Sequence, residues 1–432
     1  PPRPFSLPPP CPRAARADRR RRPPPQIPLI LDQLAAQEPT KMAIDVADSD
    51  DRHFLHFDPA KFFSDFSGFD VSTIGPLKRP KFIPIVASVL LAQSMLKRAQ
   101  GNGGKGTKGI DGFVIEMPTA GGHNAPPRGF KYDAEAKSHA LALNERGEPV
   151  YGTKDEVDLV KFRKAVKGLP FWMAGGYGKP EMLESVLAVG GQGIQVGTAF
   201  AFCEESGFID EVKQMLFTKM HEGELDVYTD PVASPTGFPF KVVQLDDLSS
   251  KEKYENRPRV CNLGYLRHAY QDDKGRIGYR CAAEPVEDWI KKGGDISATV
   301  GRKCLCNALM ADAGYPQISP FKPKNAKEEM AAKYIEEGLV TAGDDVNSCR
   351  KWVKLDEETG KWGYPADAVI DYLLEQFEFE GVVKQVELAA HRDALNAIAD
   401  KELALEAEAA AAAEETPMAA VATPVFPNVI RR

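Results

Sequence analysis

Between residues 80 and 220, short apolar runs alternate with longer runs in which apolar residues recur at helical spacing. The short runs are rich in β-branched and aromatic residues, so they predict buried strands, and the longer runs predict helices. The predicted strands are 82–88, 110–117, 169–173 and 193–196, and the predicted helices are 89–99, 155–166, 180–189 and 209–220. Four strand–helix units in succession predict an α/β fold with a parallel sheet and helical crossovers.

The flanking sequence predicts other kinds of structure. Residues 27–37 show helical spacing, residues 41–58 predict a hairpin insertion with strands at 41–46 and 53–57, and residues 366–380 predict a helix. We divide the chain into a disordered Pro/Arg-rich segment at 1–26, an α/β domain at 27–245, a mainly helical C-terminal lobe at 246–385, and an Ala/Glu-rich helix with a disordered tail at 386–432.

The stretch from Lys108 to Gly129 is the centre of the predicted chemistry. A predicted strand at 110–117 leads into a turn of small residues at 119–122, and His123 stands at its exit, followed by two prolines that disfavour a helix. A parallel α/β enzyme mounts a reactive group in this way at the carboxyl edge of its sheet. The alternative interpretation is that His123 only caps the loop by hydrogen bonding.

Two further predicted strands also end in glycine. Gly175 and Gly176 follow the strand at 169–173, and Gly197 and Thr198 follow the strand at 193–196. Neither turn carries a charged side chain, so its exposed backbone N–H groups could bind a phosphate without a lysine. The alternative is that each turn only allows a helix to pack closely on its strand.

Composition excludes several partners. The net charge of −7 gives no reason to expect a nucleic-acid partner. The longest apolar stretch, 82–92, contains Pro84 and Ser88 and is too short to cross a bilayer, so we expect no membrane partner. Seven cysteines in 432 residues do not make a disulfide framework, which favours a reduced, cytoplasmic protein. The arginine-rich start leaves an organelle transit peptide open.

The segments DGFVIEMPTAGGHNAPPRG, LPFWMAGG, GIQVGTAF and ASPTGFPFKVV, in this order between 82 and 243, resemble the nitronate monooxygenase family, formerly called 2-nitropropane dioxygenases. The resemblance implies an FMN-dependent (β/α)8 TIM barrel. Residues 257–348 resemble the C-terminal extension of a longer bacterial-type subgroup. Flavin-dependent enoyl-reductases of fatty-acid and polyketide synthesis share this barrel.

The resemblance also implies roles for single residues. His123 is implied to be the catalytic histidine that faces the flavin from the substrate side. Glu116 stands where relatives commonly have Gln, and a negative charge there would disfavour an anionic reduced flavin unless the carboxyl is protonated or paired. The implied FMN-binding residues are Glu116, Gly121 and Gly122 beside the ring, and Gly175, Gly176, Gln195, Val196, Gly197 and Thr198 around the phosphate.

The implied activity is the oxidative denitrification of nitronates or nitroalkanes with dioxygen. His123 as imidazole would remove the α-proton of a neutral nitroalkane, and as imidazolium would hold the anionic nitro oxygens. Two alternatives remain open: a flavin enoyl-reductase that takes electrons from a nicotinamide cofactor, and a non-catalytic truncated remnant that has lost flavin binding.

In the family's order the four predicted strands correspond to barrel strands five to eight. The sequence therefore predicts only the second half of the barrel, with strands one to four absent, and we expect the gene model to be incomplete at its N-terminus. A half-barrel leaves two open parallel edges, so these residues alone are expected to fold poorly and to hold FMN weakly.

Cys261, Cys281, Cys304 and Cys306 lie close together in sequence. Four thiolates would satisfy a tetrahedral zinc ion or an iron–sulfur cluster. The spacing lacks paired Cys-x-x-Cys knuckles, however, and free cysteine is often a small buried hydrophobe. We therefore assign no metal ligands from the sequence.

Overall fold

The structure is a computed structural model that describes residues 26–68, 70–101, 109–128, 130–133, 138–246, 248–249, 257–320 and 333–379. The predicted disorder at 1–25 and the predicted helix and tail at 386–432 lie outside these residues. None of the described helices is both long enough and apolar enough to cross a bilayer.

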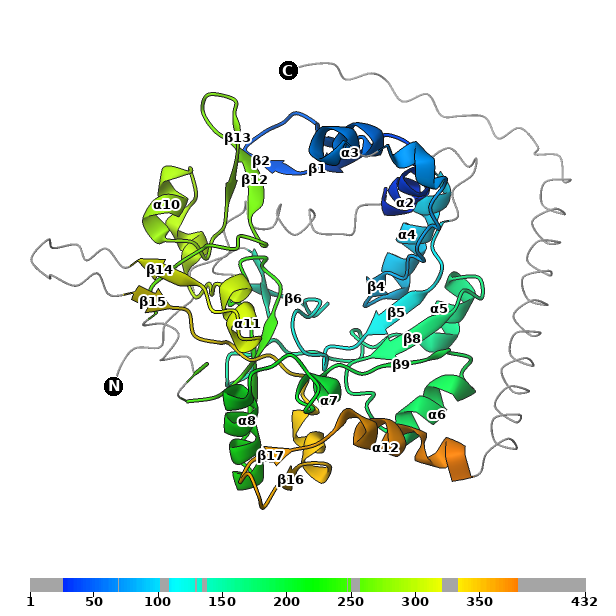
Figure 1. Cartoon of the computed structure of the whole chain (residues 1–432), viewed down its shortest axis with the longest axis vertical. Coiled ribbons are helices and arrows are strands. Elements are labelled where there is room, and N and C mark those ends of the chain that lie inside the picture. Colours follow the sequence, from blue (N-terminus) through cyan, green and yellow to red (C-terminus); the bar gives the residue numbers. More distant parts are fainter. Residues whose placement is uncertain are drawn as a thin grey trace, which may run out of the picture.

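A four-stranded parallel sheet forms the centre of the α/β region (Figure 1). Its strands, in spatial order, are β4 (Ile85–Val86), β5 (Phe113–Glu116), β8 (Phe171–Ala174) and β9 (Gly193–Gln195). The helices that connect or follow them are α4 (Val89–Gly101), α5 (Leu159–Ala165), α6 (Pro180–Ala188), α7 (Thr198–Ala201) and α8 (Asp210–Glu222). The predicted α/β class and all four strand–helix units are confirmed.

The strands and one helix are shorter than predicted, for local reasons. In the segment predicted as 82–88, Pro84 has no backbone N–H to donate, so only residues 85 and 86 pair as β4, although the Pro84 carbonyl still accepts from Val114 N at 3.0 Å. The helix predicted from 155 begins at 159, because the Asp158 side chain accepts a hydrogen bond from Lys161 N at 3.0 Å and caps it.

Aromatic packing fixes the helices against this sheet. Phe162 of α5 lies with its ring 5.8 Å from that of Phe113 on β5 and 5.7 Å from that of Phe171 on β8, both in edge-to-face geometry. All three side chains are fully buried. Edge-to-face pairs add to the hydrophobic stabilisation of such a core. The apolar runs seen in the sequence provide the residues of this core.

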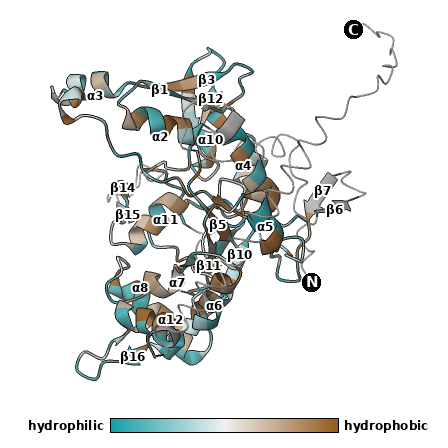
Figure 2. Cartoon of the chain, turned by 90° about the vertical axis from the view of Figure 1, so that its right-hand side faces the viewer, coloured by the Kyte–Doolittle hydropathy of each residue, from teal (hydrophilic) through white to brown (hydrophobic). Residues whose placement is uncertain are grey.

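In the described residues the sheet ends at β4 on one side and β9 on the other, so it is open and does not close into a barrel. Figure 2 shows the α2–α3 segment at one end of the molecule and α6, α7, α8 and α12 at the opposite end, with the sheet between them. The carboxyl ends of the four strands therefore meet at one edge of a four-stranded sheet.

The predicted N-terminal helix and hairpin are confirmed. They are α2 (Ile27–Ala35) and the antiparallel pair β1 (Thr40–Ile44) and β3 (His53–Phe57), followed by α3 (Pro59–Ser67) and η2 (Val71–Ile74). The sequence did not indicate that β2 (Val46–Ala47) would pair in parallel with β12 (His268–Gln271). An ion pair of 2.6 Å between Asp48 and Arg280 reinforces this link between the start of the chain and the C-terminal lobe.

The C-terminal lobe mixes hairpins and helices, which corrects the prediction that it is mainly helical. Antiparallel hairpins are favoured over helix wherever glycine and aspartate turns interrupt the apolar runs, as at 272–275. The elements of the lobe are β12, β13 (Ile277–Arg280), α10 (Val286–Lys291), η3 (Ile296–Thr299), α11 (Leu305–Asp312), β14 (Ile318–Pro320), β15 (Lys333–Ile335), η4 (Val346–Lys351), β16 (Lys354–Leu355), β17 (Trp362–Gly363) and α12 (Ala366–Phe379).

Two hairpins precede the lobe. They are β6 (Phe130–Asp133) with β7 (Ser138–Leu141), and β10 (Val227–Asp230) with β11 (Phe240–Val243).

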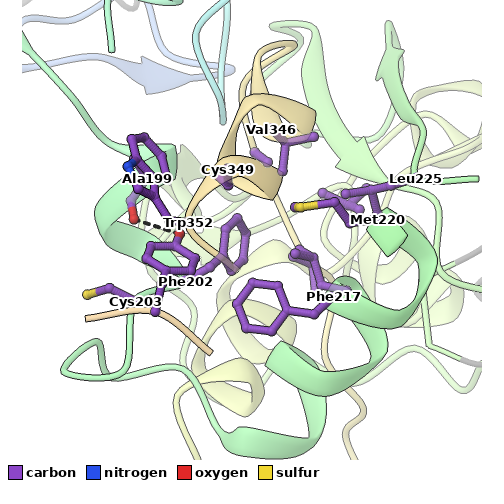
Figure 3. Packing of buried hydrophobic residues seen from close by; sticks show 14 of the residues in the cluster. Ala199, Phe202, Cys203, Phe217, Met220, Leu225, Val346, Cys349 and Trp352 are labelled. Carbon is purple, nitrogen blue, oxygen red and sulfur yellow. Dashed lines mark hydrogen bonds between the residues drawn. The ribbon is translucent and has the colours of Figure 1, made fainter. Parts of the chain in front are cut away.

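A second hydrophobic core joins this lobe to the end of the α/β region. Figure 3 shows Phe217 and Met220 of α8 beside Trp352 and the η4 turn that carries Cys349. The buried Tyr364 hydroxyl donates to the Ala199 carbonyl of α7 at 2.7 Å. Because this core includes residues from both regions, α7 and the turn that precedes it are positioned by the C-terminal lobe as well as by the sheet.

Candidate functional site

The His123 loop is held as an extended segment against β11. Asn124 N donates to the Pro239 carbonyl and Lys241 N donates to the Gly122 carbonyl, each at 2.9 Å, and His123 forms a β-bridge with Phe240. The His123 and Phe240 rings lie 4.8 Å apart, edge to face. The backbone of His123 is thus fixed on a strand, as a catalytic side chain requires.

A short chain of hydroxyl groups meets the imidazole. His123 Nε2 lies 2.7 Å from Ser234 Oγ, and Ser234 Oγ lies 2.6 Å from Thr236 Oγ1. Ser234 is 0% exposed, so its hydrogen bond with His123 is shielded from solvent. A buried hydrogen bond of this kind selects the tautomer and the orientation of the ring. Sequence reasoning did not identify Ser234 or Thr236, which follow His123 by more than 100 residues.

The glycine turns after β5 and β8 pack on each other. A Cβ on Gly175 would lie 2.9 Å from both Ala120 N and the Met117 carbonyl, and the φ of Gly175 is +90°, so only glycine fits there. A Cβ on Gly176 would approach nothing closer than Thr119 Oγ1 at 3.4 Å. Gly175 therefore allows the turn after β8 to pack closely on the turn after β5, whereas Gly176 faces a less crowded space.

A segment of the C-terminal lobe, residues 341–345 (the 341–345 segment), crosses this edge of the sheet. Thr341 Oγ1 accepts from Gly122 N at 2.8 Å, and Asp344 N donates to the Thr119 carbonyl at 3.0 Å. Gly343 N donates to Thr198 Oγ1 at 2.9 Å. A Cβ on Gly121 would lie 2.8 Å from the Ala342 carbonyl carbon, so the space beside Gly121 is filled by protein backbone.

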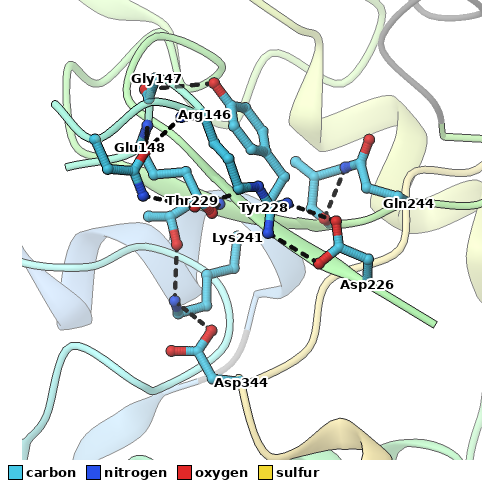
Figure 4. Close-up of polar contacts among 11 residues, drawn as sticks. Arg146, Gly147, Glu148, Asp226, Tyr228, Thr229, Lys241, Gln244 and Asp344 are labelled. Atoms are coloured by element: carbon cyan, nitrogen blue, oxygen red, sulfur yellow. Dashed lines mark hydrogen bonds and ion pairs between the residues drawn. The ribbon is translucent and has the colours of Figure 1, made fainter. Parts of the chain in front are cut away.

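Lys241 ties the 341–345 segment to the hairpin β10–β11 (Figure 4). Its Nζ donates to Asp344 Oδ1 at 2.7 Å and to Thr229 Oγ1 at 2.8 Å, and the residue is 2% exposed. On the same hairpin, Thr229 N donates to Glu148 Oε1 at 2.9 Å. A buried ammonium whose charge is matched by a carboxylate is stable only while both stay in place, so this pair fixes the 341–345 segment.

Glu116 is the last residue of β5 and stands at the edge where the loops meet. Burial raises the pKa of its carboxyl to about 7. At neutral pH the carboxyl is therefore protonated in a large part of the molecules. Burial therefore lowers the negative charge that a carboxylate would otherwise carry at this position.

The glycines that were predicted to hold a flavin differ in how much open space lies beside their backbone. Open space adjoins Gly122 and Gly197, where an added Cβ would meet nothing within 4 Å, and Gly176 is open but for Thr119. These positions fit a group that approaches the backbone and accepts N–H donors. A Cβ on Gly121 or Gly175, in contrast, would meet protein backbone at less than 3 Å, so these two glycines allow segments of the chain to approach each other closely.

Comparison with known proteins gives one family. Residues 80–230 match the family model of nitronate monooxygenase. No curated protein matches the chain at a significant level.

Three solved structures are similar to the chain over part of its length. They are a FabK variant from Thermotoga maritima (15% identity, 69% of this chain and 59% of that chain, TM-score 0.31), a nitroalkane oxidase from Streptomyces ansochromogenes (19%, 37% and 38%, 0.25) and the enoyl reductase domain of MlnA from the macrolactin biosynthesis cluster of Bacillus amyloliquefaciens (14%, 77% and 72%, 0.35). The chain thus spans less than two thirds of the first two.

Proposed function

We propose that the protein is a flavin-dependent oxidoreductase that oxidises nitronates or nitroalkanes with dioxygen, because residues 80–230 match the nitronate monooxygenase family model. The four strands are proposed to be strands five to eight of a flavin-binding barrel. One observation carries the proposal: a histidine at the carboxyl edge of a parallel sheet is fixed by a buried serine and stands beside open glycine turns.

The cofactor is proposed to be FMN. Gly176 and the segment Gln195, Val196, Gly197 and Thr198 would hold its phosphate, and Glu116 and Gly122 would border its ring. When bound, FMN supplies the electron transfer that no side chain of the protein can perform. Gly121 and Gly175 serve instead to bring the 341–345 segment and the neighbouring loop close to the site.

His123 is proposed to move the substrate proton. When Nε2–H donates to Ser234 Oγ, the lone pair that can act as a base is on Nδ1. The α-proton of a neutral nitroalkane passes to this nitrogen, and the imidazolium then faces the anionic nitro group. The Ser234 hydroxyl accepts from the imidazolium and donates to Thr236, so the positive charge is solvated without bulk water.

Glu116 is proposed to keep the ring side of the site uncharged. A carboxyl with a pKa of about 7 is neutral in a large part of the molecules, and in that form it can donate a hydrogen bond to an adjacent anion and does not repel it. The raised pKa is thus compatible with a ring that becomes anionic on reduction. A glutamine in the same place would have the same formal charge as the protonated Glu116.

Substituting His123 tests the proposal. In the full-length protein, His123→Asn is expected to lower kcat/KM for a neutral nitroalkane by about 10²- to 10⁴-fold, the usual contribution of a general base. The preformed nitronate needs no proton removed, so its oxidation should fall much less. The matched control is His56→Asn, an exposed histidine on β3, which should change neither rate.

Two outcomes contradict the proposal. One is that a colourless, folded full-length protein cannot be reconstituted with FMN. The other is that bound flavin is bleached by NADPH and not by an anaerobic nitronate, which would indicate an enoyl-reductase.

A further inference from the structure

A small cavity in the C-terminal lobe has a strongly cationic wall. Its volume is about 190 Å³, and the cationic residues that line it are Arg257, Arg259, Arg302 and Lys303. Glu336 is the one acidic residue among the described residues of the lining. When Glu336 is ionised, the wall of this cavity, here called the cationic cavity, still has an excess of three positive charges.

The nearby acids compensate only one of these cations. Arg257 Nη1 lies 3.8 Å from Glu336 Oε1, and Arg257 Nε lies 3.3 Å from Glu337 Oε2. Glu336 is buried, and burial raises the pKa of its carboxyl to about 7, so at neutral pH it carries its full charge in only part of the molecules. The positive charge of the wall is therefore only weakly offset from within the cavity.

Arg302 is fixed by hydrogen bonds that leave its charge uncompensated. Its Nε donates to the Ala298 carbonyl at 3.1 Å, and its Nη1 donates to the Val232 and Ser234 carbonyls at 2.8 and 2.6 Å. These bonds use three of the five N–H groups of a guanidinium, and within the described part of the chain the two on Nη2 have no hydrogen-bond partner. Burial lowers the pKa of Arg302, because the nearby Asp230 only partly offsets the cost of burying the charge.

Arg259 and the start of α11 belong to the same wall. Arg259 donates to the Ala282 carbonyl at 3.2 Å and to the Thr299 carbonyl at 2.7 Å, so its guanidinium is also held by uncharged acceptors. Cys304, the N-cap residue of α11, lines the cavity, and the N-terminus of a helix carries a partial positive charge. Donors that the fold already holds in place lose little freedom when a ligand binds, which favours binding.

The wall determines the sign and the size of a suitable ligand. Its positive charge repels a metal cation, and no group of three or more Cys, His, Asp or Glu side chains in the described residues is placed to hold one. Guanidinium groups match the oxygens of a phosphate in geometry, and several positive charges favour a polyvalent anion. Pockets for drug-sized ligands measure about 300–1,000 Å³, so a cavity of about 190 Å³ suits a small anion.

We propose that the cationic cavity binds a phosphate group, either as free phosphate or as the phosphate of a small metabolite. Arg302 and Arg259 donate hydrogen bonds to its oxygens, and Lys303 adds positive charge. None of the residues proposed to hold the flavin is among the described residues that line this cavity. The proposal therefore does not rest on flavin binding or on the oxidation of nitronates.

The test is calorimetric titration of the full-length protein with inorganic phosphate at pH 8 and constant ionic strength. We expect one saturable site per chain, and no saturable binding of acetate, a monovalent anion, over the same concentration range. Methyl phosphate is titrated in parallel. Tighter binding of inorganic phosphate identifies the free ion as the ligand, and tighter binding of methyl phosphate identifies a phosphorylated metabolite.

Three variants locate the site. Arg302→Gln should weaken phosphate binding at least about tenfold, because a charged hydrogen-bond donor is lost. Glu336→Gln removes the acid of the lining with little change of shape, so it should tighten binding about threefold or more, and it is the test if Arg302→Gln does not fold. Arg276→Gln is the control: its side chain is 73% exposed and pairs with Asp272 away from the cavity lining, so it should bind phosphate as the unchanged protein does.

Four results would overturn the proposal. The unchanged protein could show no saturable binding of phosphate or methyl phosphate, or Arg276→Gln could weaken binding as much as Arg302→Gln, which would indicate a general charge effect. Glu336→Gln could leave the affinity unchanged or reduce it. Finally, saturation with FMN could abolish phosphate binding, which would show that phosphate occupies the flavin site. A protein that binds phosphate but no flavin would refute the proposed function and leave this proposal standing.

Discussion

Ser234→Ala is the most direct test of how His123 is held. The substitution removes the hydroxyl that lies 2.7 Å from His123 Nε2 and 2.6 Å from Thr236 Oγ1, in a position that is 0% exposed. Water does not replace the lost partner there, and the imidazole becomes positively charged when it accepts the substrate proton. A hydrogen bond to a charged group contributes about 1.5–3 kcal/mol. If most of the energy of the His123–Ser234 hydrogen bond is gained when the imidazole becomes charged, its loss lowers kcat/KM by roughly 10- to 150-fold, since about 1.4 kcal/mol corresponds to a factor of ten.

The assay compares a neutral nitroalkane with its preformed nitronate. Loss of the hydroxyl should reduce the rate with the neutral substrate more than the rate with the nitronate, because only the former makes the imidazolium from a neutral histidine. A purely structural serine would lower both rates equally, or neither. The unfolding free energy is measured in parallel, and we expect it to fall by about 1 kcal/mol.

Ser249→Ala is the matched control. Ser249 is 2% exposed and donates to the Val243 carbonyl at 2.6 Å, so this substitution removes a similar buried hydrogen bond that does not involve the histidine. The Ser249→Ala protein should lose about as much unfolding free energy as the Ser234→Ala protein and keep full activity. The reasoning is refuted if Ser234→Ala keeps kcat/KM within twofold of the unchanged protein, or if Ser249→Ala loses as much activity.

Two further predictions concern stability. The pKa of Glu116 is raised by burial from 4.5 to about 7, so ionising this carboxyl costs folding free energy that is absent below pH 4.5, grows between pH 4.5 and 7, and is constant above. Glu116→Gln should therefore stabilise the protein on the order of 1–3 kcal/mol at pH 8 and by nothing at pH 4, measured by urea unfolding; an equal effect at both pH values would contradict it. Gly343→Ala places a Cβ 2.9 Å from the Thr119 carbonyl and should cost about 1–3 kcal/mol, whereas Gly207→Ala, with nothing within 4 Å, should stay within about 0.5 kcal/mol in the same unfolding experiment.

The parts of the fold that could be predicted depend on local pattern. The strand and helix of each α/β unit are encoded by apolar residues two or three to four positions apart, and Pro180 marks a helix start within its own segment. The pairing of β2 with β12 joins residues more than 200 positions apart. Two-residue strands carry no periodicity, so no local signal could have placed β2 in a sheet with the C-terminal lobe.

The site shows the same division. His123 and Gly176 could be found because a turn of small residues follows a strand, which is a short-range signal. Ser234, Lys241 and Asp344 could not, because their roles arise only when separate segments meet at the edge of the sheet. The role implied for Gly121 came from the resemblance alone, whereas Gly175 was predicted together with Gly176 from the glycine turn. In the structure a close backbone neighbour accounts for both glycines.

The C-terminal lobe therefore contributes to the candidate site and does not merely cover it. Thr341 accepts from Gly122 N, and Arg302 donates to the carbonyl of Ser234, which in turn contacts His123. Within residues 27–245, Ala120 N donates to the Met117 carbonyl and the Gly122 carbonyl accepts from Lys241 N of β11. The conformation of residues 119–123 is set by β11, near the end of that domain, and by the 341–345 segment of the C-terminal lobe. A strand–turn–histidine motif thus identifies where chemistry can occur, but its geometry is determined by residues that lie 100 to 220 positions later in the chain.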